Sequence, residues 1–145
     1  MDRLQILEER VQAYLAEMEL EAEQSDENLY LFKFGSTVVM ISLFEEGEDT
    51  FCRFASIMLR DFEPSLELLQ RILRLNTEVL FGSFLLFEDN TLSFSATLLG
   101  NHLDYDEFDK TLRYVARVSD DYDDELQTIG GGQRAQDVLF NEQPA

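Results

Sequence analysis

The sequence predicts a single α+β domain in which a mostly antiparallel sheet carries helices packed on one side. Short apolar runs separated by turn residues indicate neighbouring antiparallel strands, and three longer segments repeat apolar residues every three or four positions, as amphipathic helices do. The expected order is α-β-β-β-α-β-β-α. A chain of 145 residues can bury enough surface to fold as one domain without a disulfide or metal.

The first helix is expected over residues 3–19. Leu4, Leu7 and Val11 begin an apolar stripe with the spacing of one helix face, and charged residues lie off the stripe. The acidic segment 19–28 then breaks this periodicity, and we expect it to be a connector.

Three strands are expected next, over residues 29–34, 37–44 and 50–59. The segments 35–36 and 45–49 contain glycine and form the turns between them. The middle strand is apolar on both faces, which is typical of a strand covered on both sides. The short connections predict an antiparallel meander.

A second helix is predicted over residues 65–76, with Pro64 opening it at a first-turn position. Its apolar arc is wider than packing on one sheet face requires. We therefore expect part of it, with Leu68, Ile72 and Leu75 as candidates, to form a dimer interface.

A β-hairpin is predicted from residues 78–87 and 91–99. The intervening Asp89 and Asn90 tolerate the left-handed backbone that a tight turn requires.

The last helix is predicted over residues 104–127, with the glycines at 130–132 ending it. The domain is therefore expected to span residues 1–129, followed by a flexible C-terminal tail, 130–145.

The strongest compositional signal is charge: 11 Lys and Arg stand against 30 Asp and Glu, a formal net charge of −19. Such a field repels nucleic acid and anionic membrane surfaces. No run approaches the ~18 apolar residues of a membrane span. The single cysteine, Cys52, suits a reducing compartment, so a cytoplasmic location is expected.

Three stretches carry a family resemblance: NTEVLFGSFLLFEDNTLSF (76–94), the segment from residue 96 to residue 126, and TVVMISLF (37–44). Together with the order of elements and the acidity, they resemble the YbjN family, whose fold is that of class I type III secretion chaperones. The resemblance covers roughly residues 3–127. It implies a non-enzymatic protein, a homodimer that holds or regulates protein partners.

The residues with catalytic or ligand chemistry are few. His102 is the only histidine, so the chain cannot assemble a zinc site of the usual composition. Cys52 lies in a predicted strand and is expected to be a buried, inert thiol. The glycines at 130–132 lack the Lys-Ser/Thr of a phosphate loop. We therefore expect no catalytic residues, no metal and no cofactor.

Some aromatic side chains of the sheet could line a hydrophobic groove for an extended partner segment. The candidates are Phe32, Phe34, Phe54 and Met58. Methionine and aromatic residues suit adaptable recognition, and an acidic surround would favour basic partners.

The most concentrated charge lies in SDDYDDEL, residues 119–126. A calcium loop alternates ligands around a glycine, which this stretch lacks, whereas Tyr122 and Leu126 continue the stripe of the last helix. The stretch is therefore expected to be the solvated end of that helix. Its candidate acidic surface for a basic partner consists of Asp120, Asp121, Asp123, Asp124 and Glu125.

These observations favour a cytosolic protein-binding module, chaperone-like or regulatory, that acts as an acidic homodimer. The alternative from another class is a divalent-cation-responsive protein using residues 119–125 or 19–27 as ligands. A small enzyme of unknown reaction is the weaker alternative.

Overall fold

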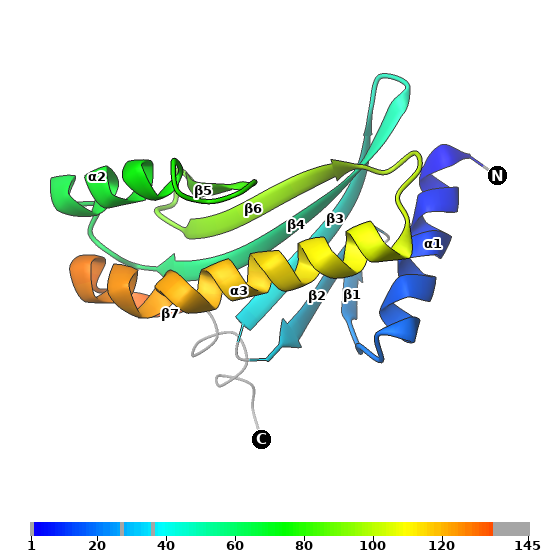
Figure 1. Ribbon diagram of the computed structural model, residues 1–145. Helices are drawn as coiled ribbons and strands as arrows, with labels where there is room; N and C mark the ends of the chain where they lie inside the picture. Colours follow the sequence, from blue (N-terminus) through cyan, green and yellow to red (C-terminus); the bar gives the residue numbers. More distant parts are fainter. Residues whose placement is uncertain (1, 27, 36, 135–145) are drawn as a thin grey trace.

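A computed structural model of the chain describes residues 2–26, 28–35 and 37–134. It contains helices on an antiparallel sheet, as predicted (Figure 1). The elements are α1 (Arg3–Glu17), β1 (Glu23–Asp26), β2 (Leu29–Phe34), β3 (Thr37–Glu46), β4 (Asp49–Arg60), α2 (Leu66–Leu75), β5 (Ser83–Leu86), β6 (Leu92–Leu99), α3 (Tyr105–Gly130) and β7 (Gln133–Arg134).

Side-chain caps fix the starts of the three helices. In α1 and α3 the N-cap carboxylates of Asp2 and Asp104 each accept a hydrogen bond from the backbone N–H three residues on. Ser65 caps α2 in the same way, at 3.2 Å from the Leu68 N–H, so Pro64 precedes the cap and does not lie in the first turn. None of the helices in the described ranges is long and apolar enough to cross a membrane.

The sheet has the strand order β1-β2-β3-β4-β6-β5, and every pairing in the described chain is antiparallel. Register places Ile41, Phe54 and Ala96 side by side across three strands. All three are buried. Because side chains alternate across a strand, this row belongs to the face that carries the main core.

Helix α3 lies across that face of the sheet and is the centre of the core (Figure 1). Phe108 of α3 is fully buried and packs its ring 5.2 Å from Phe54 of β4 and 5.4 Å from Tyr14 of α1. About three turns further along α3, the hydroxyl of Ser56 in β4 donates a hydrogen bond to the hydroxyl of Ser119 at 2.6 Å. One long helix thus joins α1 and the central strands into a single core.

Two short strands were not expected from the sequence. β1 lies in the predicted acidic connector and extends the sheet beyond β2. β7 lies in the predicted tail, where Arg134 pairs with Leu59 of β4. The start of the tail is therefore part of the sheet, and the rest of that prediction, residues 135–145, lies outside the described residues.

The predicted strand 78–87 is shorter than expected, because only Ser83–Leu86 pairs with β6. Residues 76–82 form turns that connect α2 to β5. The side-chain oxygen of Asn76 accepts from the Phe84 N–H at 2.7 Å, and Gly82 has a positive φ of 81°. The following turn was predicted correctly: Asn90 adopts the left-handed conformation, with φ 59°.

Candidate functional site

A hollow of about 640 Å³ opens beside the middle of α3. Three parts of the chain line it: the turn between β2 and β3, the connector between α2 and β5, and the exposed face of α3. The hydroxyl of Thr37 donates to the Ala116 carbonyl at 3.4 Å and holds the start of β3 against α3. The volume falls within the range of ~300–1,000 Å³ that is usual for ligand sites.

Aromatic rings provide the apolar part of this hollow. Phe81 stacks on Tyr114 with centroids 4.4 Å apart, and the Phe81 side chain remains 43% exposed. The Tyr114 hydroxyl accepts from the Leu80 N–H at 2.7 Å, which fastens the α2–β5 connector to α3. Phe34, half-buried at the end of β2, lines the hollow as well.

Cations provide its polar part. Lys110, Arg113 and Arg117 follow the 3–4 spacing of one helix face and are all exposed. The guanidinium of Arg113 lies 5.5 Å from the Phe34 ring, and that of Arg117 lies 5.5 Å from the Tyr114 ring. Both distances are within the range of cation–π attraction. The hollow is therefore a basic and aromatic site on an acidic protein.

A second set of exposed side chains is apolar and comes from α2, β5 and the residues next to them. We call it the α2–β5 face: Leu66, Leu73, Leu80, Leu86 and Phe87. Leu66 and Leu73 are 72% and 68% exposed and lie on one side of α2, and Leu80 is 82% exposed. Helix α2 and strand β5 lie together at one end of the molecule (Figure 1), and β5 is an edge strand. Large exposed leucines gathered on neighbouring elements are typical of an interaction surface.

Most of the residues predicted to line a groove lie instead in the core. Phe32, Phe54 and Met58 are each 2% exposed or less. They fill the space between sheet and helices and cannot line an open groove in this chain. Phe34 is the one candidate that lies at an open site, in the hollow beside α3.

The residues predicted to form the dimer interface are also buried within the chain. Leu68 and Leu75 are fully buried and Ile72 is 5% exposed. The apolar arc of α2 is as wide as the sequence indicated, but the side of the helix with Leu68, Ile72 and Leu75 faces the core. The apolar residues of α2 that are exposed to solvent are Leu66 and Leu73.

The acidic stretch SDDYDDEL is helical, and α3 continues to Gly130. Asp120, Asp121, Asp124 and Glu125 are exposed, whereas Asp123 is buried and does not belong to an acidic surface. Burial, followed by the nearby Asp124 charge, raises the pKa of the Asp123 carboxyl above its ordinary value.

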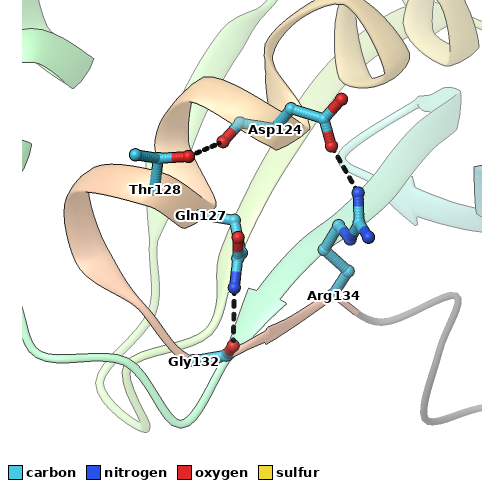
Figure 2. A network of polar contacts seen from close by, with 5 residues as sticks. All are labelled: Asp124, Gln127, Thr128, Gly132 and Arg134. Carbon is cyan, nitrogen blue, oxygen red and sulfur yellow. Dashed lines mark hydrogen bonds and ion pairs between the residues drawn. The ribbon is translucent and has the colours of Figure 1, made fainter.

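Two of the exposed acids are held by cations from other elements. Asp124 pairs with Arg134 of β7, and Glu125 pairs with Arg71 of α2. Figure 2 shows the first pair, together with the Gln127 side-chain amide, which donates to the Gly132 carbonyl at 3.4 Å and closes the turn into β7. These acids therefore tie the end of α3 to its neighbours.

The residues that could carry other chemistry lie apart from the hollow beside α3. Cys52 is fully buried, and burial raises the pKa of its thiol. His102 is exposed and lines a separate hollow of about 410 Å³ next to α1. Within the described residues, no group of three or more His, Cys, Asp or Glu side chains could hold a metal ion.

The sequence reasoning missed the cations of the hollow. The spacing of Lys110, Arg113 and Arg117 within one predicted helix was a readable signal, because it places them on one face. The sequence did not indicate that these cations lie beside Phe34 and Phe81, since the two aromatic residues come from distant segments of the chain.

Comparisons with known proteins agree on the fold and extend it to a family. A chain in the crystal structure of the ExsC–ExsE complex has a TM-score of 0.70 at 16% identity, over 87% of this chain and 97% of that one. A chain in the heterodimeric ExoU–SpcU complex from the type III secretion system of Pseudomonas aeruginosa has a TM-score of 0.61 at 13% identity, over 80% and 97%. At these identities the likeness shows the fold alone.

The match to a family model shows more than the fold. No match to the chain is found among curated proteins. Residues 5–138, by contrast, match the family model TY-Chap1, described as "T3SS (YopN, CesT) and YbjN peptide-binding chaperone 1". This match covers nearly the whole chain and agrees with the resemblance seen in the sequence. The chain therefore belongs to the TY-Chap1 family of peptide-binding chaperones, which are binding proteins and not enzymes.

Proposed function

We propose that the protein is a cytoplasmic homodimer that binds segments of other proteins, as a chaperone or a regulator. Family membership supports the binding of protein or peptide partners. The observation that supports the homodimer is the α2–β5 face, whose five large apolar side chains are each at least 40% exposed.

A second copy of the chain is the occupant that suits this face best. Leu66 and Leu73 lie seven residues apart on one side of α2, so two such helices can pack their leucines against each other. β5 is the last strand of the sheet, and the Asn76 side chain bonds both the N–H and the carbonyl of Phe84, so the leucines of α2 support the dimer more than the strand edge does. A two-fold dimer uses the same patch on both copies, so one apolar face is enough.

Light scattering on a series of exposed-leucine variants tests the dimer. Wild-type protein at micromolar concentration should have twice the chain mass, and Leu73→Asp should reduce it to one chain mass. The matched control is Leu99→Asp, which changes a leucine that is 60% exposed, against 68% for Leu73, at the end of β6 and away from α2. A monomeric wild type contradicts the dimer. A dimer that survives Leu73→Asp contradicts the assignment of the face.

The exposed acids at the end of α3 have a separate place in the proposal. Asp120 and Asp121 remain candidates for contact with a basic region of the partner, because opposite charge speeds encounter and fixes orientation. Replacing Asp121 with asparagine should then lower the association rate constant and weaken its dependence on salt. The dissociation rate constant should change less.

A further inference from the structure

The hollow beside α3 differs in charge from the rest of the molecule. The chain has 11 basic residues and a net charge of −19, yet Lys110, Arg113 and Arg117 stand within eight positions on one exposed helix face. Asp120 is the one carboxylate among the described residues that line the hollow. The lining therefore offers a partner three cations and one carboxylate, on a protein whose carboxylates outnumber its cations.

These cations have hydrogen-bonding capacity left for a partner. Lys110 pairs with Asp106 at 3.3 Å, but both side chains are exposed, so water screens the pair. Arg113 pairs with Asp109 at 2.8 Å through Nε, which leaves its terminal nitrogens available. Arg117 makes no ion pair within 4 Å in the described chain, and the Tyr114 ring steadies its guanidinium.

The apolar part of the hollow lies within reach of these cations. Arg113 lies over the Phe34 ring, and Arg117 lies over the Tyr114 ring on which the partly exposed Phe81 stacks. A ligand that fits must therefore carry an apolar group and negative charge a few ångströms apart. The hollow is open to solvent and extends from the β2–β3 turn to the α2–β5 connector, which suits an extended chain.

We propose that this hollow binds a short, extended peptide segment that is both acidic and apolar. An aromatic or leucine side chain of the segment packs on Phe81 and Phe34, and neighbouring carboxylates accept hydrogen bonds from Arg113 and Arg117. This assignment rests on the proposed peptide-binding function and specifies its ligand. A nucleic acid suits the hollow less well, because its phosphates continue beyond three cations into the acidic surface.

Fluorescence anisotropy with labelled synthetic peptides tests the assignment. Three probes share a Leu-Phe core, flanked by glutamates, by glutamines or by lysines. The glutamate peptide should bind best, and its affinity should fall as salt is added. Arg117→Gln should weaken it by about tenfold or more, because a charge-assisted hydrogen bond is lost, whereas Arg117→Lys should weaken it less. Phe81→Ala should weaken the glutamate and glutamine peptides alike.

The matched control is Arg74→Gln, which removes the same charge from an exposed position on α2. It should leave the affinity of the glutamate peptide unchanged, and circular dichroism should show that each variant is folded. If Arg74→Gln weakens binding as much as Arg117→Gln does, overall charge explains the result and the site is refuted.

The other outcomes separate this proposal from the general one. Equal or tighter binding of the glutamine or lysine peptide, unchanged in Arg117→Gln, overturns acidic specificity and leaves peptide binding intact. If none of the three peptides binds, the hollow is not a peptide site. Dissociation of a dimer by Arg117→Gln makes a second copy the occupant. Tighter binding of a peptide with the sequence of residues 135–145 makes the chain's own tail the occupant; both outcomes overturn the proposal.

Discussion

Replacing Gly82 with alanine should destabilise the fold by about 2–4 kcal/mol, more than the same change at any open turn. Gly82 stands in the connector between α2 and β5 with a φ of +81°, a conformation that costs a residue with a Cβ about 1–2 kcal/mol. An added Cβ would lie 2.7 Å from the Ser95 carbonyl oxygen and 3.0 Å from the Phe94 ring. The carbonyl belongs to the backbone of β6 and cannot rotate away.

Gly47→Ala is the matched control for this prediction. Gly47 has a φ of +64° in the turn between β3 and β4, and an added Cβ meets nothing within 4 Å. Gly47→Ala therefore includes the backbone strain of a positive φ and the reduced conformational freedom of the unfolded chain. It does not include a steric clash of the added Cβ with neighbouring atoms. The difference between the two variants isolates the overpacking against β6, about 1–3 kcal/mol.

Urea unfolding followed by circular dichroism measures both variants. Their midpoints should separate at an unchanged slope, and their melting temperatures should differ by roughly 3–10 °C. All samples need the same protein concentration, because association would make stability depend on it. If Gly82→Ala and Gly47→Ala lose the same stability within about 0.5 kcal/mol, the close packing of the connector on β6 is refuted.

Three further predictions follow from the core and the end of α3. Phe108→Ala should cost about 3–5 kcal/mol in urea unfolding, because it leaves a cavity between the helices and the sheet; a loss below 1 kcal/mol would contradict its central position. Hydrogen bonding to Arg71 lowers the pKa of Glu125, so its stabilisation is present above the ordinary carboxyl range and is lost as pH falls through the lowered value. The small stability difference between wild type and Glu125→Gln at pH 7 should therefore vanish in acid, and a constant difference would refute the pairing. Cys52 should react with a thiol reagent only after denaturation, since its thiol is buried and its pKa is raised; rapid reaction of the native protein would show that β4 opens.

The sequence was most informative where structure depends on neighbouring residues. The apolar stripe of the last helix predicted a start at residue 104, next to the observed start at Tyr105, and Asn90 predicted a left-handed turn, because both signals depend on residues a few positions apart. The strand expected at 78–87 was partly wrong for the opposite reason. Residues 76–82 form turns, and the Asn76 side chain bonds the N–H and carbonyl of Phe84, eight residues further on, a contact that no local pattern indicates.

The apolar arc of α2 shows a second limit of sequence reasoning. Leu66 and Leu73 are as hydrophobic as Leu68 and Leu75, so periodicity identifies two apolar lines but not the one that faces the sheet. The choice depends on how α2 packs against α3 and β5, which is a matter of tertiary structure. Three of the four groove candidates lie in the core for a similar reason, because a strand with an apolar row gives no sign of whether a helix covers that row.

The charged side chains along α3 differ between its middle and its C-terminal end. Like charges four residues apart at its acidic end cost about 0.2–0.5 kcal/mol per pair, and Arg71 and Arg134 offset this from other elements. The acidic end is thus engaged within the fold. The basic stripe of residues 110–117 is less so, because Arg117 makes no ion pair within the described residues. Composition alone predicts an acidic surface that attracts basic partners, whereas the placement of these cations favours an acidic segment at the hollow.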